Sequence, residues 1–478
     1  MNPVVTENHM ACFEPLLPSD SGAANMVMHG LRAMAAHVEQ SPTPVCINKE
    51  TLDGIIAEID TRLSQQLDAI LHHPKFQALE SAWRSIAFLM ERSDPSQNIR
   101  VAVLDVSKNE IAEDFDDSGS METSFLYRTV YADAYGTYGG EPFAALCTTF
   151  GFTPSYGDMR LLGQCARVAR AAHAPFLTNA DPRFLGVNDL AEFDTDTDLE
   201  ALFQGPEYAS WRAFRENDDT RYVGLCLPRF RLREPYSPHS PKKQTITYWE
   251  SFRKPEENLW GSASMALAAC LTRSFSMYRW CLHIIGPHAG GAVEQLPVPS
   301  VLDSATLEPI CPIEWSLTDR REFVLSEAGF IPMTAKQNSA SACFFSATSA
   351  HKPEMFANTP EGNAASMNAR LGAQLPYMFI ISRLAHYLKV LQREEIGRWK
   401  ERSDIERELN VWLKQYVADM ENPTPSVRAR RPLRAAQVHV EDIADEPGWY
   451  RCHLQVQPHM KYMGASFSLS LVGRLERD

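Results

Sequence analysis

The chain has 478 residues, which at roughly 150 residues per domain suggests about three domains and excludes a single small one. Hydrophobic residues make up 44% of the sequence and charged residues 22%, the composition of a globular protein able to bury a sizeable core. The formal net charge of −14 disfavours general binding to nucleic acid, although a local basic patch can still contact an acidic partner.

The ten cysteines are scattered, with no Cys-x-x-Cys pair and no Cys/His spacing typical of zinc sites. Several lie in apolar runs, where a free thiol is a small buried side chain, so a reducing compartment fits best. No stretch approaches the ~18 apolar residues of a membrane span, and the first 15 residues lack the features of a secretion signal. We therefore expect a cytoplasmic protein without cofactor, metal or membrane insertion.

The N-terminal part is predicted to be helical after an irregular start. Residues 1–46 are expected to form a flexible arm with one short helix, because helical spacing is confined to Met26–Ala35. Over residues 47–95, apolar residues recur every three or four positions, with a break at Pro74. This spacing predicts two helical segments between residues 48 and 92, either as a helical hairpin or as one long kinked helix.

Between residues 96 and 350, short β-rich runs alternate with stretches of helical spacing, the pattern of an α/β domain. The segments 232–247 and 286–312 are rich in Pro, Gly, Asp and Ser, which predicts long surface loops. The predicted strands are 99–104, 143–147, 222–226 and 342–345, and the predicted helices are 157–172 and 257–279.

Residues 351–478 are predicted to form a second α/β domain that is helical at first and then β-rich. Ser403 and Glu406 have the spacing of a capping box, which predicts that a helix begins there and runs to residue 420. One face of this helix is apolar and the other is charged. Three strands are expected after it, over 434–442, 448–457 and 464–474.

The last two predicted strands differ in their side chains. In the second, apolar residues from Cys452 to Val456 alternate with polar ones, which predicts one buried face. In the third, Phe467, Leu469 and Leu471 alternate with serines. A strand of this kind can add to the edge of another chain's sheet.

Charged residues are concentrated on the predicted helix 403–420 and in an arginine run that follows it. Two interpretations stay open: a solvated face with ion pairs worth a few tenths of a kcal/mol each, or a docking surface. The candidate residues are Arg402, Glu406, Arg407, Glu408 and Lys414 on or beside the helix, and Arg428, Arg430, Arg431 and Arg434 in the run, together with Phe467, Leu469 and Leu471 in the last strand.

Motifs with a known catalytic mechanism are absent: there is no phosphate-binding loop, nucleophile elbow, zinc-protease helix or dinucleotide fingerprint. The glycine-rich loop 285–292 leaves one enzymatic alternative, in which backbone N–H groups bind an anion beside His288. The other interpretation of the loop is a tight turn in which Gly290 and Gly291 adopt positive φ.

Several long strings of the sequence closely resemble the large contractile-sheath subunit of bacterial type VI secretion systems, the TssC/VipB family. The resemblance runs from about residue 47 to 478 and is not confined to one short motif. The strings are Leu71–Arg84, Trp211–Glu216, Arg221–Leu225, Asn258–Gly261, Tyr278–Cys281, Ile284–Pro287, Asp319–Glu322, Gln374–Ile381, Arg430–Gln437 and Tyr462–Ala465.

The resemblance implies a structural protein and not an enzyme. The implied fold is a contractile-tail-sheath-like multidomain α/β subunit, with an N-terminal helical region and a C-terminal mixed α/β domain with edge strands. Heterodimers of large and small subunits would stack as rings in a helical tube around an inner tube. Contraction of that tube would propel the inner tube and deliver effectors, and the sheath itself would need no nucleotide for this step.

The resemblance also implies the partners of the chain. These are a TssB/VipA-like small sheath subunit, neighbouring sheath protomers, an Hcp-like ring protein of the inner tube, the baseplate and a ClpV-like ATPase that recycles contracted sheaths, with no nucleic acid. The helix 403–420 would face the inner tube, and the strand 464–474 would join a sheet shared between protomers. Residues 26–35 either contact the recycling ATPase or pack in an outer helical domain.

Overall fold

A computed structural model describes most of the chain from residue 49 onward. The described residues are 29–30, 49–190, 193, 197–237, 248–250, 257–298, 311–394, 402–418, 420, 423–442, 450–459 and 469–474. The chain divides into two compact units, one of Met1–Phe76 with Pro235–Arg253 and one of Gln77–Glu234 with Lys254–Asp478. The predictions for residues 1–46 lie outside the described residues, apart from His29 and Gly30, which are helical.

The first unit is organised around the helix α3 (Lys49–Leu71), where the apolar spacing predicted it. The hydroxyl of Tyr248 donates to an Asp68 carboxylate oxygen at 2.7 Å, and His72 Nε2 lies 3.3 Å from Glu250 Oε1. The predicted apolar stripe is exposed in this chain. Between 38% and 54% of the surface is exposed in each of its large side chains Ile56, Ile59, Leu63 and Ile70.

The second predicted helix is also present, as α4 (Pro74–Glu91), and most of it belongs to the second unit. Proline suits its first position, because the ring pre-sets φ and the missing N–H would have no partner there. Phe88 and Leu89 are buried, whereas Leu79 and Trp83 are exposed. Among the described residues, other parts of the chain therefore pack against one face of α4, and its other face is exposed.

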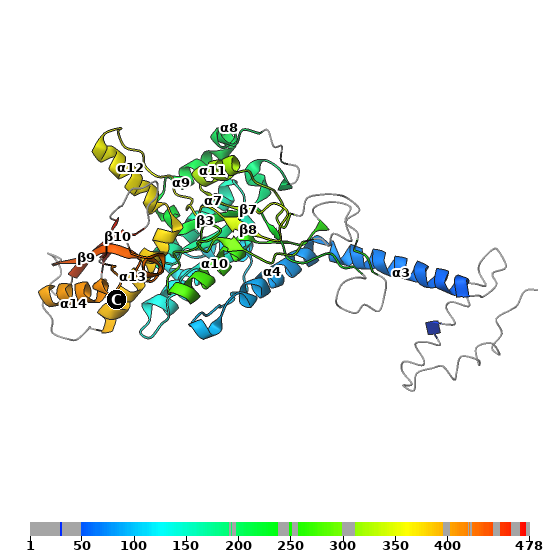
Figure 1. The fold of residues 1–478 in the computed structure, drawn as a ribbon, viewed down its shortest axis with the longest axis horizontal. Coiled ribbons are helices and arrows are strands. Elements are labelled where there is room, and N and C mark those ends of the chain that lie inside the picture. The colour runs from blue at the N-terminus through cyan, green and yellow to red at the C-terminus, as the bar shows by residue number, and fades with distance from the viewer. Residues whose placement is uncertain are drawn as a thin grey trace, which may run out of the picture. The chain divides into compact units, whose positions relative to one another are not determined.

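The second unit is built on a six-stranded sheet (Figure 1). The first four strands are parallel, and β8 and β6 extend the sheet through antiparallel pairings, which confirms the predicted α/β class. The strands in spatial order are β1 (Leu146–Phe152), β2 (Phe176–Ala180), β3 (Val223–Leu227), β7 (Phe330–Ala335), β8 (Ala342–Phe344) and β6 (Ala292–Val293). Every residue of β2 and β3 is buried, as expected for central strands of a parallel sheet.

Helices cover both faces of this sheet. Phe176 of β2 lies in the hydrophobic core that contains α7 (Tyr156–Ala171), and its neighbour Leu177 lies in the core that contains α10 (Ala263–Tyr278). This alternation is the period of two that a strand imposes. α7 connects β1 to β2, so the three elements form a parallel β-α-β unit.

Short elements make the remaining connections. The helices are α5 (Lys108–Asp117), α6 (Phe125–Tyr127), α8 (Leu199–Gln204), α9 (Ala209–Arg215), α11 (Asp319–Glu327) and α12 (Pro360–Gly372), and the π-helix is η4 (Arg128–Gly136). The 3-10 turns are η2 (Pro95–Gln97), η3 (Met121–Thr123), η5 (Pro182–Leu185), η7 (Pro206–Tyr208) and η8 (Asp218–Tyr222), and a two-stranded ladder pairs β4 (Phe230–Arg231) with β5 (Trp260–Gly261).

The C-terminal part is a second, antiparallel sheet supported by helices. Its strands are β9 (Leu433–Asp442), β10 (Tyr450–Pro458) and β11 (Leu469–Arg474), in the order β11-β10-β9, and its helices are α13 (Leu375–Glu394), α14 (Arg402–Lys414) and α15 (Pro425–Arg430). Cys452, Leu454 and Val456 are buried, which confirms the predicted alternation in the middle strand.

One hydrophobic core joins this C-terminal sheet to the preceding part of the chain. Trp280 and Leu282, which follow α10, belong to the same buried cluster as Leu413, Val438 and Leu454. The side chains of α13 fill the space between them, and its first half is buried at almost every position.

Two local predictions are wrong. Residues 99–104 form no strand, although their composition is apolar and β-branched. Ser403 is not an N-cap, because the helix already includes Arg402, and the helix ends at Lys414 and not at residue 420. The side chain of Glu406 bonds to β9 and not to the start of its own helix: it accepts from Val440 N at 3.0 Å.

Candidate assembly site

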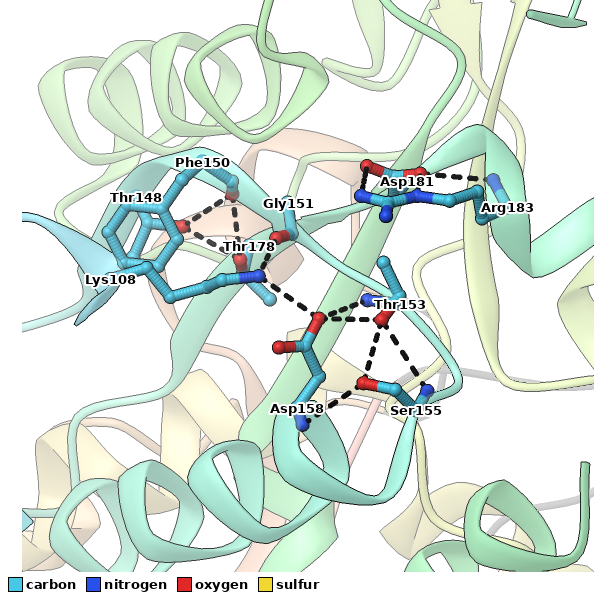
Figure 2. A network of polar contacts seen from close by, with 10 residues as sticks. All are labelled: Lys108, Thr148, Phe150, Gly151, Thr153, Ser155, Asp158, Thr178, Asp181 and Arg183. Atoms are coloured by element: carbon cyan, nitrogen blue, oxygen red, sulfur yellow. Dashed lines mark hydrogen bonds and ion pairs between the residues drawn. The ribbon is translucent and has the colours of Figure 1, made fainter. Parts of the chain in front are cut away.

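The carboxyl ends of β1 and β2 carry a dense polar network, at the edge where open α/β sheets bind ligands (Figure 2). Lys108 Nζ lies 3.0 Å from Asp158 Oδ2 and 3.1 Å from the carbonyl oxygen of Gly151. The same Asp158 oxygen accepts from Thr153 N and Thr153 Oγ1 at 2.7 and 2.8 Å. These groups satisfy one another, so the network holds the β1–α7 turn and the start of α5 in place.

Asp181 and Arg183 form the other part of the network (Figure 2). Arg183 donates from Nε and from its backbone N to Asp181 Oδ1, at 2.8 and 3.0 Å. Burial opposes ionisation of Asp181, but these hydrogen bonds outweigh it and lower the pKa of the carboxyl below its ordinary value. A carboxylate held in this way stays ionised and is a poor candidate for a general acid.

The reactivity of the buried cysteines and the grouping of metal-ligating side chains also bear on catalysis and metal binding. Burial raises the pKa of Cys147, Cys165, Cys270 and Cys281 to about 12, so these thiols are not nucleophilic at neutral pH. In this part of the chain no group of three or more His, Cys, Asp or Glu side chains lies close enough to hold a metal ion. Among the described helices, none has the length and apolar character needed to cross a membrane.

The loop 285–292 is a closed turn. Gly286 N donates to the carbonyl oxygen of Phe344 at 2.7 Å, and Gly291 N donates to that of Gly286 at 2.9 Å. Because carbonyl oxygens of the chain take these N–H groups, they are not free to bind an anion. Gly290 has the expected positive φ of 105°, whereas the second positive-φ glycine of the loop is Gly286 and not Gly291.

The segment Ile99–Val106, called here the unpaired segment, has a strand-like sequence but pairs with no described strand. Its backbone makes no hydrogen bond to other described residues, and Val103 and Leu104 are 60% and 42% exposed. Backbone N–H and C=O groups are normally paired in a folded protein, and apolar β-branched residues favour strands. The unpaired segment is therefore suited to pair with a strand from outside the described chain.

The unpaired segment is attached at both ends to the chain region that carries β1. Arg100 forms an ion pair with Glu141, which precedes β1, and Lys108 contacts Gly151 within β1. β1 itself is an edge strand, because it pairs with β2 on one side and with no described strand on the other. A free sheet edge and a strand-like segment thus occur in the same region, and sequence reasoning missed this because it treated 99–104 as a paired strand.

A second free edge belongs to β11, which includes the predicted residues Leu469 and Leu471. β11 pairs antiparallel with β10, with Leu471 opposite Leu454. Its other edge faces no described strand. Phe467 lies outside the described residues. The edge-strand position that was expected from the sequence is thus present, and strand addition there stays a prediction.

The charged residues predicted on α14 fall into two groups. Glu406 is half-buried and faces β9, where it also lies 3.2 Å from His439 Nδ1. Asn410 fastens the same face, since Asn410 Nδ2 donates to the Val438 carbonyl oxygen at 2.7 Å and Val438 N donates back to Asn410 Oδ1 at 2.9 Å. The exposed group is Arg402, Arg407, Glu408 and Lys414.

Two of the exposed α14 residues have local ion-pair partners. Arg407 lies 2.7 Å from Asp404, and Arg402 lies 3.7 Å from Asp442 at the end of β9. Exposed pairs of this kind contribute about 0–1 kcal/mol each. They leave the outer face of α14 charged without fixing it strongly.

The four predicted arginines lie on one exposed stretch. Arg428 and Arg430 belong to α15, and Arg431 and Arg434 connect α15 to β9 and begin that strand; all four side chains are exposed. Their charge acts on a nearby histidine: burial lowers the pKa of His459, and Arg428 and Arg434 lower it further. The four arginines are thus exposed close to the start of the C-terminal sheet, and their role in subunit contacts stays a prediction.

The edges of β1 and β11 pair with no described strand, and such sheet edges can pair with a strand of another chain. The comparisons with known proteins define the class: residues 53–351 match a tail sheath N-terminal domain, and residues 364–475 match a tail sheath gpW/gp25-like domain. The chain belongs to the EvpB/VC_A0108 (VipB) family of tail sheath proteins, which confirms the resemblance found in the sequence.

The type VI secretion system sheath protein TssC1 of Pseudomonas aeruginosa is 34% identical over 465 residues, which cover 96% of this chain and 93% of that protein. The family and this relative are structural sheath proteins and not enzymes. The chain is thus a structural subunit of a contractile sheath.

Two solved structures show a weaker likeness. The baseplate of the anti-feeding prophage aligns with a TM-score of 0.30 at 8% identity, covering 67% of this chain and 63% of that one. A sheath tail protein of Desulfitobacterium hafniense aligns with a TM-score of 0.27 at 10% identity, covering 66% and 60%. The matched part spans less than two thirds of either solved chain.

Proposed function

We propose that this chain polymerises with a small sheath subunit into a helical tube around an inner tube of ring proteins, in the cytoplasm of a bacterium. Contraction of the tube propels the inner tube and delivers effectors. The family and the similarity to TssC1 support this assignment. One observation indicates that the chain needs a partner. The unpaired segment is strand-like and exposed, makes no backbone hydrogen bonds to other described residues, and occurs in the same region as the free edge of β1.

The small, TssB/VipA-like subunit is the occupant proposed for this region. One strand from it would pair with backbone groups of Ile99–Val106 or of β1 and cover Val103 and Leu104. Each strand hydrogen bond contributes about 1 kcal/mol net, and burial of the exposed apolar area adds about 25 cal/mol per Å². Several bonds made together give a stable heterodimer, the unit from which the tube grows.

The C-terminal part is proposed to make contacts between protomers and with the inner tube. The free edge of β11 would accept a strand of a neighbouring protomer. The exposed residues Arg402, Arg407, Glu408 and Lys414 of α14 would face an Hcp-like ring protein, with weak contacts that let the inner tube leave. Further contacts with the baseplate and with a ClpV-like recycling ATPase are part of the proposal, as are the domain boundaries 1–46, 47–95, 96–350 and 351–478.

Contacts that repeat from protomer to protomer account for both the helical tube and its contraction. Contacts between different surfaces of identical units give an open helical polymer when the rotation between neighbouring units does not close into a ring. A lattice assembled in an extended, less stable arrangement releases free energy when its subunits repack, so the contraction step needs no nucleotide.

The test is co-expression of the chain with the small sheath subunit encoded beside it, followed by electron microscopy of negatively stained lysate. We expect hollow tubes with both subunits present, and aggregation or poor solubility of the chain expressed alone. A soluble monomer that ignores the small subunit and forms no tubes would contradict the proposal. The enzymatic alternative, an anion-binding loop at 285–292, would then return, although the N–H groups of Gly286 and Gly291 already donate to carbonyl oxygens of the chain.

A further inference from the structure

A pocket of about 440 Å³ lies where the end of α10 meets the loop after α14 and the end of α15. Its walls come from both matched tail sheath domains. Trp280 and Tyr416 stand perpendicular with ring centroids 5.3 Å apart, and Trp280 Nε1 donates to the Arg430 carbonyl oxygen at 3.2 Å. These contacts hold the aromatic wall in place without a ligand.

The rim of the pocket is apolar and positively charged. Met277 is 50% exposed, and the guanidinium groups of Arg279 and Arg430 are exposed beside it. Arg279 donates to the carbonyl and side-chain oxygens of Gln97, which are neutral acceptors. The pocket lining contains no carboxylate. Trp280 itself is only 4% exposed, so the accessible apolar surface is that of Met277 and the partly exposed Tyr416. Such a site selects a carboxylate next to an apolar side chain, because the arginines attract the charge and these two side chains contact the apolar group.

Another part of the same chain carries this combination of groups. In Glu354–Phe356, called here the knob, all three side chains are exposed, Met355 to 68% and Phe356 to 47%. The knob is held at both ends: Lys352 N donates to the Arg215 carbonyl oxygen at 2.9 Å, and Phe356 N donates to Ser366 Oγ of α12 at 2.8 Å. A fixed loop that exposes Met and Phe beside Glu is a pre-organised docking element, since ordering it on binding costs little.

The knob and the pocket lie near different helices. The knob leads into α12, and Tyr416 follows α14, and these two helices lie on opposite sides of β9 and β10 in Figure 1. A contact between the knob of one copy and the pocket of another joins two different surfaces. Contacts of this type can be repeated from copy to copy, and they give a ring or, when the rotation does not close, an open helix.

We propose that in the assembled sheath the knob of one protomer binds in the Trp280–Tyr416 pocket of a neighbouring protomer, with Glu354 between Arg279 and Arg430 and with Met355 or Phe356 against Met277 and Tyr416. The inference rests on the proposed function, because it needs tubes. It names a contact that neither free sheet edge provides, and it places that contact at the junction of the two matched domains.

Charge-reversal variants test the contact in tubes formed with the small subunit. Arg430→Glu and Glu354→Arg should each reduce tube yield at 150 mM salt by about tenfold, the usual scale of a lost close charge pair. The double variant should recover most of the yield, because it restores the pair in reverse. Arg167→Glu and Glu113→Arg, exposed residues elsewhere, are the matched controls and should not respond to each other.

Cysteine cross-linking provides a readout that does not depend on charge. Met277→Cys with Met355→Cys should give a ladder of covalent large-subunit multimers after mild oxidation of tubes, and neither single variant should give it. If wild-type chains form tubes but no ladder appears and the double charge variant is not rescued, the contact is refuted while the proposed function stands. If wild-type chains form no tubes with the small subunit, the proposed function itself fails.

Discussion

The proposed partner strand leads to a sharp prediction at Val103. Val103→Pro removes one backbone N–H from the unpaired segment, and Val103→Thr keeps that N–H and the β-branched shape. In the structure this N–H has no backbone partner and the side chain is mostly exposed, so either substitution should change the stability of the chain alone by less than about 0.5 kcal/mol. In the heterodimer the proline deletes a strand hydrogen bond and leaves a partner carbonyl buried without a donor.

The size of the effect follows from these two losses. A net hydrogen bond contributes about 1 kcal/mol, and an unsatisfied buried carbonyl costs a further 1–2 kcal/mol or so. Together they predict a loss of about 2–3 kcal/mol, which weakens binding of the small subunit roughly 30- to 150-fold. The threonine variant should bind within about threefold of the wild type.

A competition assay measures this difference without isolating the large subunit. Two large subunits with different tags, one wild type and one variant, are co-expressed with a limiting amount of the small subunit, and their ratio in the purified heterodimer is determined. We expect the proline variant to be almost excluded and the threonine variant to be incorporated equally. Equal incorporation of both variants would refute strand pairing at Val103.

Three further predictions concern the C-terminal part and the core. Deleting residues 464–478 removes β11 and should abolish tubes while the heterodimer still co-purifies; normal tubes by electron microscopy would refute this. Reversing Arg430 and Arg431 to Glu should lower tube yield more strongly at 50 mM than at 500 mM salt, because screening weakens surface charge contacts, and a yield independent of salt would exclude an interface role. Burial lowers the pKa of His173 to about 4 and of His386 to about 3, so both are neutral in the folded chain and charged when unfolded below pH 6.5. Stability is therefore complete above pH 6.5 and falls by about 2 kcal/mol per histidine at pH 5; thermal melting of the heterodimer should lose less on acidification in His386→Gln, and an unchanged pH slope would contradict this reasoning.

The sequence predicted what depends on local pattern. A continuous apolar run predicted the position of the buried strand β3. The alternation of apolar and polar residues from Cys452 to Val456 predicted the buried face of β10. The same reasoning overpredicted at 99–104, because apolar β-branched residues show that a segment can pair but not whether its own chain supplies the partner. Exposure and the lack of backbone hydrogen bonds, which only the structure provides, turned this failed prediction into a candidate binding site.

Tertiary contacts explain the other differences. Ser403 and Glu406 match a capping box, yet Glu406 bonds to Val440 of β9, which lies 34 positions later in the sequence. The arginine run was recognisable from its composition, but its position beside Trp280 was not, because 150 positions separate Trp280 from Arg430. Sequence patterns alone could not bring these segments together.

The core shared by Trp280, Leu282, Val438 and Leu454 has a mechanical consequence. A hinge between the two matched tail sheath domains would have to pull these side chains apart and expose them to water, at about 1.5–3 kcal/mol for each fully buried apolar side chain. The second unit should therefore behave as a stiff lever during contraction. The elastic energy of a sheath made from this chain would then be stored in the contacts between its protomers, and the travel of the inner tube would be set by how far each lever turns.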